Sequence, residues 1–315
     1  RKPKRGAIAQ VVLFTSIWST LVSLFGLLAV LPTLLGVLQQ RGVVTLDPNG
    51  SSSIQLGPDD VNALLAASST TTLAVSAATA LGTILSVWIM QRFFDGPALL
   101  DLGLRRRPGW LADSVVGLAL GPVMFGAILL ILLAAGWASV GPGEITAQSF
   151  LTAFLTFVLV AFSEEVFARG WVLQVLEKGR GKRAAVIGSA GIFATLHALN
   201  PGFGLMALVG LFLAGLLFAQ AYMVTRQLWL PMALHLSWNF SEGPLLGFPV
   251  SGLPSEGLLL TRPTGPEVIT GGAFGPEAGL VVVLGIGLAA AAIWYLSRHR
   301  AGRADQSARD VPGAA

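Results

Sequence analysis

The segment FLTAFLTFVLVAFSEEVFARGW (residues 150–171) begins as a largely apolar run and ends with two adjacent glutamates and an arginine. An apolar run of this kind is typical of a helix that crosses a bilayer, whose hydrocarbon core needs about 20 apolar residues per helix. Ionisable residues inside such a helix cost about 2.5–3.5 kcal/mol each on insertion scales, and they usually serve a function. The segment therefore predicts a membrane helix that carries charged side chains for a purpose.

The composition of the whole chain supports a membrane protein. Its 315 residues are 54% hydrophobic and only 11% charged, whereas soluble domains carry about 25% charged residues. This excludes an ordinary cytosolic enzyme. The absence of cysteine excludes disulfides, thiolate nucleophiles and Cys-based metal sites. The net charge of +4 comes from Lys and Arg in tails and loops, a pattern that indicates membrane topology rather than nucleic-acid binding.

We expect an all-α, polytopic membrane protein with about eight transmembrane helices. The predicted spans are 8–38, 62–91, 113–136, 149–176, 184–199, 204–225, 228–248 and 278–297. Basic clusters occupy every second connection: RKPKR before the first span, RRR at 105–107, EKGRGKR at 177–183, Arg226, and RHRAGR after the last span. Because positively charged loops stay in the cytoplasm, this alternation predicts that both termini are cytoplasmic.

Four regions follow from these patterns. Residues 1–144 hold three predicted spans, and residues 145–250 form a core that contains the buried ionisable side chains. Residues 251–300 are expected to form an external loop, rich in Gly and Pro, and the last membrane helix. The segment 301–315 is small and polar, so we expect it to be disordered.

Polar residues within the predicted spans occur at comparable depths. The set comprises Glu164, Glu165, Arg169, His197, His235 and Asn239. Counted from the basic loop at 178–183, Glu164 and His197 each lie 14 residues into their helices, or about 21 Å at 1.5 Å per residue. We therefore expect these two side chains at one level. His235 lies only nine residues past Arg226, about 14 Å, which matches only if its helix is tilted or begins deeper, at Pro231.

Spacing within the helices separates the two glutamates. Glu165 and Arg169 are four residues apart, in the order that favours an intrahelical ion pair. Adjacent helical residues differ by about 100°, so Glu164 points elsewhere and is free to face the histidines. His235 and Asn239 are also four apart and share a face.

These groups can hydrolyse an amide bond in two ways. In the first, Glu164 takes a proton from water while a histidine orients that water, and His235 and Asn239 donate hydrogen bonds to the oxyanion. In the second, Glu164, His197 and His235 hold a divalent metal such as Zn²⁺, which acidifies the water. The residues alone leave both mechanisms open. A covalent mechanism is disfavoured because the sequence has no Cys and no G-x-S-x-G serine.

Three motifs in order resemble one family. EEVFAR (164–169), FATLH (193–197) and HLSWN (235–239) match the patterns EExxxR, FxxxH and HxxxN. The sequence thereby resembles the CPBP family of intramembrane proteases, also called the CAAX protease and bacteriocin-processing or Abi family, which includes the Ras-converting type of CAAX prenyl endopeptidase. The resemblance covers roughly residues 145–250 and implies an eight-helix fold with a membrane-embedded site open to the cytosol and the lipid.

The resemblance also implies roles for individual residues. Glu164 would be the catalytic carboxylate, with His197 as its partner on the water. His235 and Asn239 would form the oxyanion side. The residues with a supporting role would be Glu165, Arg169 and Phe193. The family is usually described as metalloproteases, although a metal-free glutamate mechanism has also been argued for it, so the cofactor stays open.

We therefore expect an intramembrane endopeptidase that cleaves a membrane-associated protein or peptide. The Ala/Gly/Leu/Arg-rich composition resembles proteins of GC-rich bacteria, so we expect a multi-pass protein of a bacterial plasma membrane. The expected partners are the lipid bilayer and the substrate, with no nucleic acid. Two alternatives are a proton-coupled transporter, because buried Glu/His sets also occur there, and a non-catalytic membrane partner or immunity protein with a protease-like core.

Overall fold

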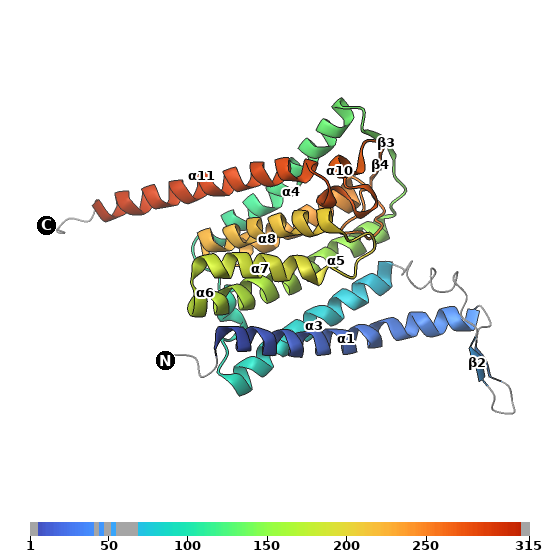
Figure 1. The fold of residues 1–315 in the computed structure, drawn as a ribbon, viewed down its shortest axis with the longest axis horizontal. Coiled ribbons are helices and arrows are strands. Elements are labelled where there is room, and N and C mark those ends of the chain that lie inside the picture. The colour runs from blue at the N-terminus through green and yellow to red at the C-terminus, as the bar shows by residue number, and fades with distance from the viewer. Residues whose placement is uncertain (1–5, 41–43, 47–51, 55–68, 310–315) are drawn as a thin grey trace. The chain divides into compact units, whose positions relative to one another are not determined.

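The computed structural model describes residues 6–40, 44–46, 52–54 and 69–309 (Figure 1). The predicted basic cluster RKPKR, the first part of the predicted span 62–91 and the last residues, 310–315, lie outside the described residues. In chain order the longer elements are α1 (Ala7–Gln40), β1 (Val44–Leu46), β2 (Ser52–Ile54), α3 (Ser69–Phe94), α4 (Trp110–Ala134), β3 (Ala138–Pro142), α5 (Ala147–Glu165), α6 (Gln174–Arg180), α7 (Lys182–Leu196), α8 (Leu205–Thr225), α9 (Trp229–Phe240), β4 (Leu259–Pro263), α10 (Glu267–Thr270) and α11 (Val281–Arg309). The shorter helical turns are η1 (Leu99–Leu102), η2 (Val166–Leu173), η3 (Ser241–Leu245), η4 (Gly272–Phe274) and η5 (Pro276–Ala278).

Six helices of the described part are long and apolar enough to cross a membrane. Their bounds are Ala7–Gly36, Ser69–Phe94, Trp110–Ala134, Ala147–Arg180, Leu205–Thr225 and Val281–Arg298. The protein is therefore a largely helical, multi-pass membrane protein. Helices also form at the other two predicted spans, but α7 has 15 residues and α9 has 12. At 1.5 Å per residue they reach only about 22 and 18 Å, short of a hydrocarbon core of about 30 Å. The expected number of eight spans is thus not confirmed.

The described chain forms two compact units, and the first comprises residues 12–99 and 146–163. Within it α1 and α3 pack together. The Trp18 indole donates a hydrogen bond to Thr83 Oγ1 at 2.9 Å, and the hydroxyls of Thr33 and Thr71 are 2.7 Å apart. Such bonds between helices stabilise packing in a bilayer, where lipid tails supply no hydrophobic drive for association.

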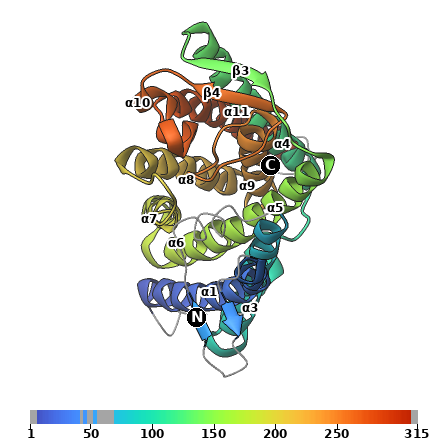
Figure 2. The ribbon, with the colours of Figure 1, turned by 90° about the vertical axis from the view of Figure 1, so that its right-hand side faces the viewer.

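The second unit comprises residues 1–11, 100–145 and 164–315. Here α8 lies between α7 and α11, and α4 packs along α9 (Figures 1 and 2). The strands β3 and β4 pair antiparallel, with Val140 opposite Thr261. Neither this pair nor the pair of β1 with β2 was predicted, because the composition of the connecting segments is typical of loops.

Two glycines of α4 allow α9 to approach closely. A Cβ atom at Gly117 would lie 2.8 Å from the backbone of Leu230 and Leu234, and one at Gly121 would overlap the Ser237 carbonyl. Ser237 also bonds across the contact, since its hydroxyl donates to the Gly117 carbonyl at 2.7 Å and accepts from the Gly121 amide at 3.2 Å. This small-residue packing holds the helix that carries two of the predicted site residues.

Gly121→Ala is expected to destabilise the protein by about 1–3 kcal/mol, because the new methyl group displaces α9. Gly126→Ala on the same helix is the matched control, since a Cβ there meets nothing within 4 Å, and Ala favours helix over Gly by about 1 kcal/mol. Thermal unfolding of both variants in detergent measures the difference. Equal unfolding temperatures would show that α4 does not seat α9 in this way.

The C-terminal helix is longer than the predicted span 278–297. The last helix, α11, continues to Arg309 and so enters the segment 301–315, which the small, polar composition led us to expect as disordered.

Candidate active site

The helix that carries the two glutamates changes its winding directly after them. The α-helical part, α5, ends at Glu165, and residues Val166–Leu173 form a π-helix before α6 begins. All eight residues of this π-helix are buried. The Ser189 hydroxyl on α7 donates to the Ala168 carbonyl at 2.9 Å, which satisfies an acceptor of the widened turn. π-Helical turns occur often at functional sites, but no residue pattern in the sequence marked this one.

The predicted ion pair between Glu165 and Arg169 is present and fully buried. Arg169 Nη1 lies 2.8 Å from Glu165 Oε1, and Nη2 donates to the Gly215 carbonyl of α8 at 2.8 Å. The guanidinium carbon also lies 4.5 Å from the ring centroid of Phe193 and 5.1 Å from that of Phe218. These aromatic faces stabilise the buried cation.

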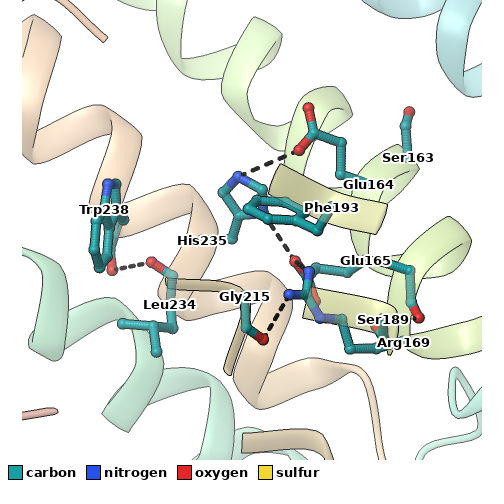
Figure 3. Close-up of polar contacts among 12 residues, drawn as sticks. Ser163, Glu164, Glu165, Arg169, Ser189, Phe193, Gly215, Leu234, His235 and Trp238 are labelled. Atoms are coloured by element: carbon teal, nitrogen blue, oxygen red, sulfur yellow. Dashed lines mark hydrogen bonds and ion pairs between the residues drawn. The ribbon is translucent and has the colours of Figure 1, made fainter. Parts of the chain in front are cut away.

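Glu165 has a second partner that sequence reasoning missed. Its Oε1 atom lies 3.0 Å from His235 Nδ1, as Figure 3 shows. An ionised carboxylate only accepts hydrogen bonds, so Nδ1 carries the proton and the other ring nitrogen, Nε2, points to Glu164. The ring of Phe218 stacks on the imidazole at 4.7 Å and 16°. The local spacing of EExxxR could not reveal this contact, since it joins residues 70 positions apart.

Glu164 and the two histidines converge, as the sequence predicted. Glu164 Oε2 lies 3.9 Å from His197 Nε2 and 3.9 Å from His235 Nε2. The side chains of Glu164, His197 and His235 are 23%, 13% and 5% exposed. His197 was expected inside a helix, within the predicted span 184–199. It instead caps the end of α7. Its depth still brings it to Glu164.

The three facing atoms share one chemical property. His197 Nδ1 lies 3.0 Å from the Phe193 carbonyl, which can only accept, so Nδ1 is the donor and Nε2 carries a lone pair when the ring is neutral. His235 has the same arrangement. Glu164 Oε2 is buried and has no hydrogen-bond partner. Two acceptor nitrogens thus face a third acceptor, Glu164 Oε2, and the space beside that oxygen is suited to a group that supplies hydrogen or positive charge.

Asn239 lies on α9 one turn after His235 and is 6% exposed. Within the described residues its carboxamide makes no hydrogen bond to another side chain or to the backbone. The carboxamide is therefore available to a ligand, but the structure gives it no contact with Glu164 or His197.

Glu164, His197 and His235 are residue types that bind zinc, but the distances between their facing atoms are too long for a tetrahedral zinc site. Two imidazole nitrogens and a carboxylate oxygen form a known zinc set. However, atoms 3.9 Å apart and bonded to one metal at about 2.1 Å would subtend an angle of about 140°, far from the tetrahedral angle of about 109°. A water molecule at about 2.8 Å from each atom would subtend about 90°. Consistent with this, the described residues contain no group of three His, Asp or Glu close enough to hold a metal ion.

Comparison with known proteins agrees with the motifs. Residues 146–241 match the family model described as type II CAAX prenyl endopeptidase, Rce1-like. Comparisons with curated proteins and with solved structures gave no match. The matched range includes Glu164, Glu165, Arg169, His197 and all of α9. Residues 146–241 of this chain are therefore similar to the type II CAAX prenyl endopeptidases of the Rce1-like family.

Proposed function

We propose that this chain is an intramembrane endopeptidase in which Glu164 activates a water molecule. One observation carries the proposal: Glu164 Oε2 faces two imidazole nitrogens at equal distances of 3.9 Å and has no hydrogen-bond partner of its own. The family match supports peptide hydrolysis over the transporter and the non-catalytic alternatives. We place the activity in a bacterial plasma membrane, with a membrane-associated protein or peptide as substrate.

The reaction follows from the donors and acceptors around the water. The water donates one hydrogen to Glu164 and the other to an imidazole Nε2. These two hydrogen bonds direct a lone pair of the water oxygen at the substrate carbonyl carbon. As the new C–O bond forms, Glu164 takes the proton. The carbonyl oxygen becomes an oxyanion that accepts from Asn239 Nδ2. Glu164 then returns the proton to the amide nitrogen as the C–N bond breaks.

The surrounding residues keep the imidazole of His235 in place. Glu165 fixes the proton on Nδ1, so Nε2 is the nitrogen that faces the water. Arg169 compensates the charge of Glu165 and is itself anchored to α8. In this proposal neither residue touches the substrate, and both act through the ring of His235.

A cleavage assay tests the proposal. The purified protein in liposomes is incubated with a panel of lipidated and unlipidated peptides, and products are identified by mass spectrometry. Cleavage of at least one peptide supports the proposal. Proton flux across the liposome membrane without any cleavage would favour the transporter instead.

Metal removal gives a separate expected result. Because the spacing of Glu164, His197 and His235 suits water, we expect cleavage to persist after dialysis against a chelator and to stay within about twofold of the untreated rate. Metal content of the same samples is measured in parallel. Loss of activity on chelation, with recovery on adding Zn²⁺, would show that the three side chains close around a metal.

A further inference from the structure

A buried carboxylate outside the family-matched range connects two parts of the site. Glu277 lies in η5 and is 4% exposed. Its Oε1 accepts a hydrogen bond from the Trp238 indole at 2.9 Å, and its Oε2 accepts from the Ser251 hydroxyl at 2.6 Å. Trp238 belongs to α9 and directly precedes Asn239. One end of this carboxylate therefore holds the helix that carries His235.

The other end leads to the loop that follows His197. Ser251 uses its carbonyl to accept from the Asn200 carboxamide at 2.8 Å, and Asn200 bonds through its backbone amide to the His197 carbonyl at 2.9 Å. The helix α7 has already ended at Leu196. Glu277 is thus joined through Ser251 and Asn200 to the segment that places the His197 ring.

A second carboxyl group lies beside Glu277 without partners. Glu242 in η3 is fully buried, and neither of its carboxyl oxygens makes a hydrogen bond within the described residues. Its Oε1 would lie 3.4 Å from a Cβ atom at Gly275, two positions before Glu277. The charge that acts on it is that of Glu277.

Two neighbouring buried carboxylates without a cation cannot both be ionised at a low cost. Glu277 accepts two hydrogen bonds, which stabilise its charged form. Burial, and after it the charge of the neighbouring Glu277, raise the pKa of the Glu242 carboxyl well above its ordinary value, which favours its neutral form. The two glutamates thus differ in their surroundings, since Glu277 accepts two hydrogen bonds and the Glu242 oxygens accept none within the described residues.

We propose that Glu277 is a positioning residue of the peptidase, which fixes the position of the His235 helix relative to the His197 loop, and that Glu242 beside it is protonated. This inference rests on the proposed function, because the relative position of the two segments matters only for a reaction that needs both histidines. It adds a residue from the C-terminal segment to a site whose motifs all lie within residues 146–241.

Two substitutions of equal shape distinguish the two glutamates. Glu277→Gln keeps the volume but removes the charge and places an amide N–H₂ against one of its two donors. We expect kcat to fall by about tenfold or more, with KM within about twofold of the wild type, since hydrogen bonds to charged groups are lost and no substrate contact is changed. Glu242→Gln replaces a neutral acid by a neutral amide, and we expect kcat within about twofold of the wild type.

Hydrogen exchange of the backbone amides at 198–204 supplies a readout that does not depend on activity. Exchange is expected to be faster in Glu277→Gln than in the wild type and unchanged in Glu242→Gln. Ser251→Ala keeps the Glu277 charge and loses only one hydrogen bond, so it is the variant to use if Glu277→Gln does not fold, and it should also speed exchange in this segment. In the double variant Glu277→Gln/Ser251→Ala, kcat should be no lower than in Glu277→Gln alone.

Unchanged kcat and unchanged exchange in Glu277→Gln would overturn the positioning role. A loss of activity in Glu242→Gln as large as in Glu277→Gln would overturn the assigned protonation. If the wild type cleaves nothing, the proposed function fails, while the exchange data still decide whether Glu277 connects the two segments.

Discussion

Replacing Glu164 by Gln is expected to lower peptide cleavage by about 10²–10⁴-fold, the usual contribution of a positioned general base. The amide cannot take a proton from water, yet it keeps the shape of the side chain. The folded state should not suffer, because Glu164 Oε2 has no hydrogen-bond partner to lose. We therefore expect an unfolding temperature equal to or above that of the wild type, as is common when a functional site carries an uncompensated group.

Initial rates on the best peptide of the panel and thermal unfolding in the same detergent measure both effects. Glu256→Gln is the matched control, since Glu256 is exposed and should leave both quantities unchanged. Wild-type turnover by Glu164→Gln would exclude Glu164 as the base. A large loss of unfolding temperature would instead identify Glu164 as a structural residue.

Replacing Arg169 by Met is expected to cost about 3–5 kcal/mol of folding free energy, because it leaves Glu165 as an uncompensated buried charge. The change also removes the bond to the Gly215 carbonyl and the contacts with two aromatic rings. Activity should fall as well, since the anchor of His235 is disturbed. Thermal unfolding and the cleavage assay measure the two losses.

A surface ion pair with the same spacing provides the control. Arg105 and Asp101 are also four residues apart and lie 2.6 Å apart, but their side chains are 58% and 47% exposed. Arg105→Met should cost less than about 1 kcal/mol. The double variant Glu165→Gln/Arg169→Met should regain stability but not activity, because the charge that holds His235 Nδ1 is still missing. Equal costs for the buried and the exposed arginine would contradict the importance of the buried network.

The sequence predicted those features that depend on local composition or on short spacing. Apolar length located all six long apolar helices of the described residues, and i, i+4 spacing predicted the pair of Glu165 with Arg169. Depth counting brought Glu164 and His197 to one level. The contact between Glu165 and His235 could not be predicted, because nothing in either motif specifies which glutamate meets which ring nitrogen.

Other features were hidden by composition. The Gly- and Pro-rich stretch 249–277 indicated an external loop, yet it contains β4 and ends at the buried Glu277. The two short helices α7 and α9 looked like full spans because the apolar sequence continues past their ends. The π-turns after Glu165 and after Phe240 depend on tertiary contacts such as the bond from Ser189 to Ala168, and no local pattern marks them.

The brevity of α9 also bears on how the protein is made. Even with the π-turn η3 that continues it to Leu245, this helix is shorter than the about 20 apolar residues that retention in the bilayer by hydrophobicity alone requires. Its stable residence therefore depends on the glycine face of α4, which leaves the ribosome more than a hundred residues earlier. We therefore expect α9, which carries His235, to take its final place only after α4 is in the membrane.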